Sequence, residues 1–219
     1  MWKRPSTLKA NPLSVLRPLA KHLPFPEQVV PWLESQLAPY TYQLKVTRPR
    51  KTKLGDFRPP QQGRVPTITL NGNLPPYQFL VTLVHELAHL ITWEQHGRRA
   101  APHGKEWKHC FGDLLHSLLA AAQWPPLFVA AAGRHAARPK STTAGDPDLQ
   151  RALLELDQVD GMQAALLLSD LQAGQCFLFK GRGFAVMEHR RTRTLVRELQ
   201  TQNKYLIPMI AEVEVLKGE

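Results

Sequence analysis

Residues 77–91 read Tyr77-Gln-Phe-Leu-Val-Thr-Leu-Val-His85-Glu86-Leu-Ala-His89-Leu-Ile91, an apolar run that carries the pattern His-Glu-x-x-His. Residues four apart lie on one face of a helix, so His85 and His89 can present imidazole nitrogens to a single ion. Zinc is the metal that this pattern binds, and Glu86 is then placed to meet a water at the metal rather than to ligate it. The run therefore predicts a buried helix that holds one zinc ion and a general base.

A third protein ligand must come from elsewhere, because a catalytic zinc ion takes three and leaves one position for water. His103 stands in Pro102-His103-Gly104, where proline and glycine mark a connection that can return the chain to the metal. The residues favour His103 for this role, and a bond from its ring to backbone at the start of the next helix is the alternative. Glu106, on that next helix, is the other candidate for the third ligand.

In these motifs the chain resembles the SprT-like metallopeptidases, the group that includes the Spartan proteases acting on DNA–protein crosslinks. The likeness covers about residues 30–120 and rests on three short motifs and on the strand pair expected before the zinc helix. These motifs are His85-Glu-Leu-Ala-His89, Gln95-His-Gly97 and Pro102-His-Gly-Lys-Glu-Trp107, and the strand pair is Thr47–Gly55 with Pro66–Asn71.

The resemblance implies that His85, His89 and His103 bind zinc, that Glu86 is the general base, and that the reaction is peptide-bond hydrolysis. Many relatives also carry a C-terminal zinc ribbon built on four cysteines. This chain contains 2 cysteines, so that ribbon cannot form here.

The order of the expected elements indicates an α+β fold. We expect a zincin-like metallopeptidase domain over residues 1–132, with a short sheet packed on the zinc helix and a further helix at about 104–122 pressed against it. Residues 133–148 are polar and contain proline, which is typical of a linker. Residues 149–219 show a short helical stretch and then short apolar strands, which predict a small β-rich module like an SH3 barrel.

The positive charge of the chain lies in its first part. Residues 1–150 contain 19 Lys or Arg against 9 Asp or Glu, and residues 151–219 contain 9 of each. Such a basic region attracts polyanions, so we expect a nucleic acid as a partner, while a solvated basic face is the alternative. Charge alone does not separate DNA from RNA, and single-stranded or damaged DNA is the candidate that we name. The candidate contacts are Arg48, Arg50, Lys51 and Lys53. A competing candidate is the basic run at residues 190–193 in the strand-rich part.

The expected function is a zinc-dependent metalloendopeptidase with protein substrates, and the resemblance suggests DNA-associated or DNA-crosslinked proteins among them. The alternatives are a non-catalytic zinc-containing module that binds nucleic acid, and a metal-dependent hydrolase acting on nucleic acid itself. The first residues lack the apolar core of a signal peptide, and no stretch suits a membrane span. We therefore expect a cytoplasmic protein without a membrane partner.

Overall fold

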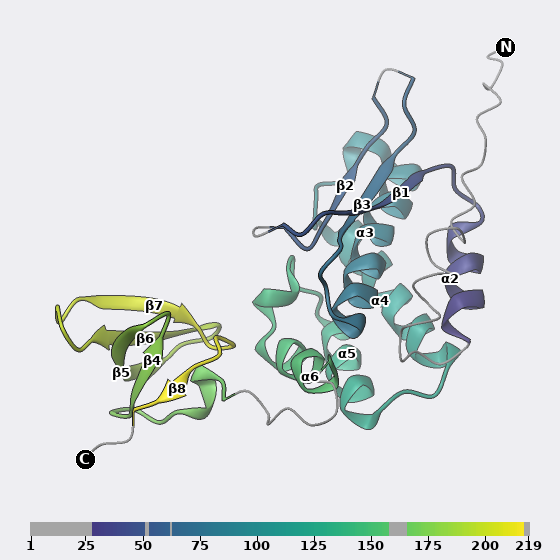
Figure 1. The fold of residues 1–219 in the computed structure, drawn as a ribbon. Helices are drawn as coiled ribbons and strands as arrows, with labels where there is room; N and C mark the ends of the chain where they lie inside the picture. The colour runs from purple at the N-terminus through teal and green to yellow at the C-terminus, as the bar shows by residue number, and fades with distance from the viewer. Residues whose placement is uncertain (1–27, 51–52, 62, 158–165, 217–219) are drawn as a thin grey trace, which may run out of the picture. The chain divides into compact units, whose positions relative to one another are not determined.

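The computed structural model describes residues 28–50, 53–61, 63–157 and 166–216 (Figure 1). It is an α+β structure with helices and two separate sheets, and it divides into two compact units, residues 1–140 and 141–219. The boundary between the units lies inside the segment 133–148 that was expected to be a linker. Among the described residues, no helix is both long and apolar enough to cross a membrane.

The first unit is built around one long helix, and its elements follow one another along the chain as helix, three strands and three helices. They are α2 (Val29–Leu37), β1 (Gln43–Thr47), β2 (Gly55–Arg58), β3 (Thr67–Asn71), α3 (Pro76–His96), α4 (Lys105–Ala121) and α5 (Pro126–Ala137), with a short 3-10 turn, η1 (Gly97–Arg99), after α3. The helices predicted around residues 77–91 and 104–122 are therefore confirmed.

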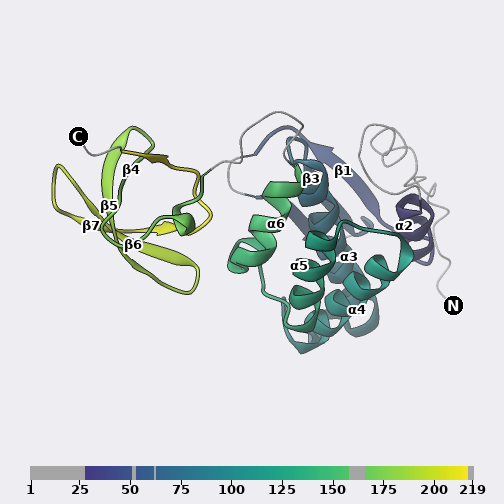
Figure 2. The ribbon, with the colours of Figure 1, turned by 90° about the horizontal axis from the view of Figure 1, so that it is seen from below.

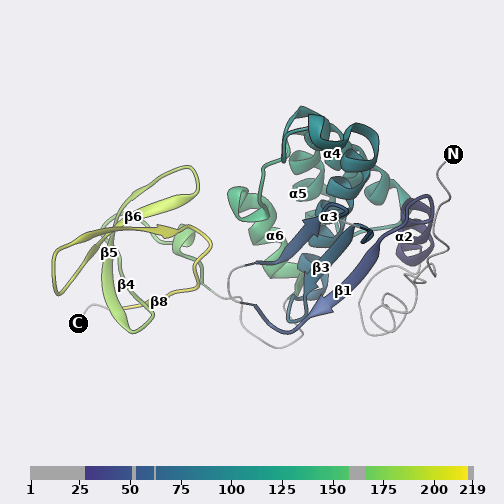
Figure 3. The same cartoon turned by 90° about the horizontal axis from the view of Figure 1, so that it is seen from above.

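Helix α3 is buried on nearly all sides, which explains why its sequence is apolar almost throughout. The three-stranded sheet covers one side of α3 and α4 covers another (Figure 3). Proline at the first helical position suits the start of α3, because no helical hydrogen bond needs its missing N–H there. Helix α5 packs on α4, and α2 is tied to α4 by a hydrogen bond of 2.9 Å from Trp32 Nε1 to Ser117 Oγ.

The sheet of the first unit has the order β1-β3-β2. Strands β1 and β3 are parallel, with Leu44 opposite Ile68, and β2 is antiparallel to β3, with Phe57 opposite Ile68. Strand β2 is thus an edge strand, and it packs against α3. Of the strand pair expected from the sequence, Pro66–Asn71 contains β3, whereas Thr47–Gly55 falls between β1 and β2 and shares only one end residue with each.

The second unit holds a curved, five-stranded antiparallel sheet in the order β7-β6-β5-β4-β8 (Figure 2). Its elements are η2 (Thr143–Gly145), α6 (Pro147–Asp157), η3 (Leu168–Asp170), β4 (Cys176–Phe179), β5 (Arg182–His189), β6 (Arg193–Glu198), β7 (Lys204–Pro208) and β8 (Glu214–Val215). The strand-rich character of this part is confirmed, although β7 was not predicted. Buried residues from η3 and the strands, among them Phe177, Phe184 and Val196, form its core.

Candidate metal centre

Three histidine side chains meet at one point of the first unit. His85 and His89 come from successive turns of α3, and His103 comes from the loop before α4. The Nε2 atom of His103 lies 3.1 Å from that of His89 and 3.2 Å from that of His85. A tetrahedral zinc ion with Zn–N bonds of about 2.0–2.1 Å separates its nitrogen ligands by about 3.3 Å. The three nitrogens are therefore spaced as ligands of one metal ion.

The backbone of His103 is held in an uncommon conformation that brings its ring to the other two. Its φ angle is +57°, in the left-handed region that non-glycine residues rarely occupy. The turn is closed by a hydrogen bond of 2.8 Å from the Gly104 N–H to the Ala101 carbonyl, directly before α4 begins. Such backbone strain persists where the surrounding structure imposes it, and it is concentrated at functional sites. The alternative role for His103, in which its ring bonds to backbone at the start of α4, does not explain this geometry.

Aromatic side chains pack against the three imidazole rings. The Trp107 ring is fully buried, and its centroid lies 4.7 Å from those of His85 and His103 and 5.1 Å from that of His89. Phe57 of β2 stacks on His89 with a centroid separation of 6.1 Å. Rings packed in this way restrict the rotamers of the histidines, so the nitrogens are positioned before any ion binds.

The local environment keeps the histidines in the form that binds metal. Burial lowers the pKa of His85 to about 3 and that of His89 to about 4, with the neighbouring imidazoles adding to the effect. The pKa of His103 is also lowered, first by burial and then by the charge of Lys108. All three rings are therefore neutral near pH 7, and only a neutral imidazole has a nitrogen lone pair for a metal ion.

Glu86 directly follows His85 on α3 and is 6% exposed, and its carboxyl group is hydrogen-bonded by the backbone of Phe57, whose ring stacks on His89. Burial is the main reason that the pKa of its carboxyl is raised to about 8, and the charge of Asp56 raises it further. A hydrogen bond from the Phe57 backbone N–H and the charges of Arg50 and Lys53 act in the opposite direction. A carboxyl group whose pKa lies near neutrality is suited to accept and return a proton.

Strand β2 approaches Glu86 so closely that only glycine fits at position 55. A Cβ atom built on Gly55 would lie 2.4 Å from Oε1 and 2.8 Å from Cγ of Glu86. Gly55 and Phe57 were not predicted from the sequence as parts of the site. The available signal was a glycine within a short stretch next to a motif, which is typical of a close approach between backbone and another group.

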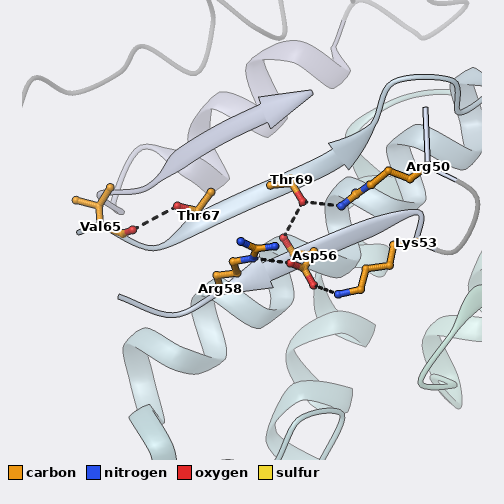
Figure 4. A network of polar contacts seen from close by, with 7 residues as sticks. All are labelled: Arg50, Lys53, Asp56, Arg58, Val65, Thr67 and Thr69. Carbon is orange, nitrogen blue, oxygen red and sulfur yellow. Dashed lines mark hydrogen bonds and ion pairs between the residues drawn. The ribbon is translucent and has the colours of Figure 1, made fainter. Parts of the chain in front are cut away.

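Of the four candidate nucleic-acid contacts before β2, the three that the structure describes lie in different environments. Arg48 is exposed, and Lys51 lies outside the described residues. Lys53 forms an ion pair of 2.7 Å with Asp56, which also accepts a hydrogen bond from Arg58 (Figure 4). The run is therefore not one uniform basic face, and its contact with nucleic acid stays a prediction.

Arg50 turns inward toward β3 instead of lying on the surface with Arg48. Its Nη1 donates to Thr69 Oγ1 at 3.3 Å, and its Nε and Nη2 atoms are buried (Figure 4). The buried side chain of Asn71 makes two hydrogen bonds to the Arg50 backbone. Its Oδ1 accepts from the Arg50 N–H at 2.9 Å, and its Nδ2 donates to the Arg50 carbonyl at 2.8 Å. These contacts indicate a role for Arg50 in holding the chain before β2 in place.

The ligand atoms of His85, His89 and His103 form a metal-binding group within the described residues, with all three atoms inside 4.8 Å of one another. Glu106 is not a member of this group, and its Oε1 lies 3.8 Å from Lys105 Nζ. In the described part of the chain, no cluster of carboxylates suitable for a metal ion occurs. The arrangement can hold one ion by three neutral nitrogens, with a buried carboxyl group beside it.

Comparison with known proteins points to one family. The model of the SprT-like family matches residues 41–117, which include β1 to β3, α3 and most of α4. Protein SprT of Klebsiella pneumoniae is 61% identical over 31 residues, and Protein SprT of Salmonella arizonae and of Salmonella newport are each 71% identical over 31 residues. These matches cover 14% of this chain and 18% of each relative's length. No solved structure matches the chain.

Proposed function

We propose that the chain is a zinc-dependent metalloendopeptidase, and the premise is that residues 41–117 match the model of the SprT-like family. The observation that carries the proposal is the convergence of three neutral imidazole nitrogens, from His85, His89 and His103, beside the buried carboxyl group of Glu86. A structural zinc site fills all four positions with protein ligands, whereas three nitrogens leave one position open. A purely structural site also has no need for a carboxyl group held next to the ion.

Glu86 is the general base in the proposed reaction. A zinc ion bound here would polarise the scissile carbonyl, lower the pKa of water, and favour the ionised form of Glu86. Glu86 takes the proton of the attacking water and then passes it to the nitrogen of the leaving amine. The hydrogen bond from the Phe57 N–H orients the carboxylate, and the packing against Gly55 limits its rotamers.

We also propose the finer features of fold and substrate that the resemblance implies. The first unit is a zincin-like domain, and the second is a small SH3-like barrel that binds a partner. DNA-associated or DNA-crosslinked proteins are the proposed substrates. In support, residues 1–140 carry 19 Lys or Arg against 7 Asp or Glu, a charge that favours a protease working close to nucleic acid.

The test is incubation of the zinc-loaded full chain with an unfolded protein, with and without single-stranded DNA, while both polymers are followed on gels. We expect the protein to be cleaved and the DNA to remain intact. Glu86→Gln should keep the fold and the metal, because the amide retains the shape of the carboxylate, and should lose about 100-fold or more in hydrolysis.

The outcomes separate the proposal from its alternatives. Cleavage of the DNA would favour a hydrolase of nucleic acid. A wild-type chain that binds zinc and DNA but cleaves neither polymer would favour a non-catalytic module. Undiminished proteolysis by zinc-replete Glu86→Gln would remove Glu86 from the mechanism.

A further inference from the structure

The outward side of strands β6 and β7, in the second unit, carries a regular pattern of side chains. Burial alternates along β6, where Thr194, Val196 and Glu198 are buried and the residues between them are exposed or half-buried. Strand β7 is one edge of the five-stranded sheet and pairs with β6, so residues directly opposite each other share a face (Figure 2). The outward residues form a surface that we call the β6–β7 face: Arg193, Leu195 and Arg197 on β6, with Lys204, Leu206 and Pro208 on β7.

The register of the two strands places like side chains opposite each other on this face. Arg197 lies opposite Lys204, and Leu195 lies opposite Leu206. Leu206 is 43% exposed, and Leu199, two residues beyond Arg197, is 40% exposed. Basic and apolar side chains therefore alternate at every second residue along β6 and the residue that follows it.

The charges of the β6–β7 face are not balanced by nearby carboxylates. Cations directly opposite each other on neighbouring strands repel and destabilise the pairing. Neither Arg197 nor Lys204 makes a side-chain hydrogen bond or ion pair within the part of the chain that the structure describes, and Arg193 donates to a backbone carbonyl of β7 at 3.4 Å. Glu188 of β5, which shares this face, lies 3.6 Å from the Nε atom of Arg190. An acidic ligand would relieve the repulsion between the cations.

The spacing of this pattern suits an acidic protein segment that also carries leucine-like side chains. In an extended chain, side chains two residues apart point to the same side and are about 6.6–6.8 Å apart. A partner in the same conformation can therefore place carboxylates against the cations and apolar side chains against the leucines. Carboxylates form charge-assisted hydrogen bonds with arginine, and contact between apolar side chains removes the exposed leucine surface from water.

Nucleic acid is a poorer match for the β6–β7 face. The apolar members of this face are aliphatic leucines, whereas proteins that bind single strands stack the bases on aromatic rings. Residues 151–219 contain 9 Lys or Arg against 9 Asp or Glu, so this part of the chain has no net positive charge to attract a polyanion. Local cations with exposed leucines between them favour a peptide.

We propose that the β6–β7 face binds an extended acidic segment of a partner protein, in which carboxylates alternate with leucine-like side chains. The inference rests on the proposed role of the second unit as a partner-binding module, and it names the surface and the chemistry of the partner. It does not depend on the metal centre or on peptide hydrolysis.

The test is fluorescence anisotropy of a labelled synthetic peptide titrated with the zinc-loaded full chain. The peptide repeats Glu-Ser-Leu-Ser, so that glutamate and leucine alternate along one side when it is extended. All proteins in the assay carry Glu86→Gln, and mass spectrometry checks that the peptide stays intact. The parent should bind saturably at low salt and more weakly as salt rises. The triple variant Arg193→Gln/Arg197→Gln/Lys204→Gln should bind about 10-fold more weakly, because each exposed ion pair contributes a factor of about 1.5–5.

A matched triple variant changes the net charge by the same amount. Lys180→Gln/Arg190→Gln/Arg191→Gln replaces exposed cations elsewhere on the same unit and should bind as the parent does. Leu206→Ser, at an exposed position, should weaken binding several-fold without unfolding the protein.

Charge reversal separates recognition from a structural role of the same side chains. The double variant Arg197→Glu/Lys204→Glu should lose the glutamate peptide and bind a peptide that carries lysine in place of glutamate. A purely structural role would not exchange the preference in this way.

Four results would overturn the proposal. They are no binding of the glutamate peptide by the parent at low salt, equal losses in the two triple variants, an unchanged preference after charge reversal, and tighter binding of a labelled oligothymidylate than of the peptide by this face. The assay measures no hydrolysis, so its failure would leave the peptidase proposal standing. Failure of peptide hydrolysis would leave this result unchanged.

Discussion

Gly55→Ala is the substitution for which the structure makes the sharpest prediction. The added Cβ would lie 2.4 Å from Oε1 of Glu86 and 2.8 Å from Cγ2 of Thr82, whereas ordinary contacts begin at 3.4 Å. The carboxylate must therefore move by about 1 Å, or β2 must move away from α3. A displacement of about 1 Å at a catalytic group costs on the order of 100-fold in rate, and overpacking costs about 1–3 kcal/mol of stability.

The assay combines three measurements on the zinc-loaded protein: kcat for an unfolded protein substrate, zinc content, and Tm. We expect Gly55→Ala to lose about 100-fold in kcat, to keep its zinc because the substitution contacts no ligand, and to melt a few degrees lower. Gly133→Ala in α5 is the matched control, because its added Cβ meets nothing closer than Leu119 Cδ1 at 3.9 Å. An alanine in this helix should leave kcat unchanged and stabilise the fold by about 0.5–1 kcal/mol.

Wild-type kcat in a folded, zinc-replete Gly55→Ala protein would refute the argument that β2 positions Glu86. Loss of zinc together with activity would show that the substitution acts on the ligands instead of the base. Only a loss of kcat with zinc retained supports the reasoning.

The remaining predictions concern the ligands and the effect of pH. His103→Ala should lose most of the bound zinc and Glu106→Gln should keep it, as measured by metal analysis after dialysis; the reverse result would make Glu106 the third ligand. In the metal-free protein, burial holds the pKa values of His85 and His89 at about 3 and about 4, below the unfolded value of 6.5. The unfolded chain therefore binds protons that the folded chain does not, so the Tm should fall as the pH drops from about 6.5 toward 4. The double variant His85→Leu/His89→Leu should show a shallower fall over that range, and an identical slope would contradict the assigned pKa values.

Helix α3 could be predicted from the sequence because the spacing of residues along it indicates both a buried helix and a pair of histidines that could bind a metal ion. Apolar residues throughout residues 77–91 indicate a buried helix, and the spacing of four residues places His85 and His89 on one face. The position of His103 was harder to predict, because the loop that carries it has no periodicity. Its conformation depends on a φ of +57° and on the ring of Trp107 packed behind it.

Elements whose existence depends on a distant partner were missed or misplaced. Strands β2 and β7 are edge strands of four and five residues without a clear alternation, and each forms only through pairing with a neighbouring strand. The last residues of α5 were expected to be part of a linker. Residues 133–137 are helical because Ala132, His135 and Ala136 are buried in the packing of α5 on α4.

The sequence by itself indicated a histidine group that could bind a metal ion, predicted Glu86 as the general base, and determined that the net positive charge lies in the first part of the chain. These properties depend on residue type and local spacing. Only the tertiary structure decided that β2 approaches Glu86 at Gly55 and that Arg50 turns inward toward β3. The physical reason is that contacts between residues far apart in sequence are decided by the packing of strands and helices against α3 and α4, and no local pattern records that packing.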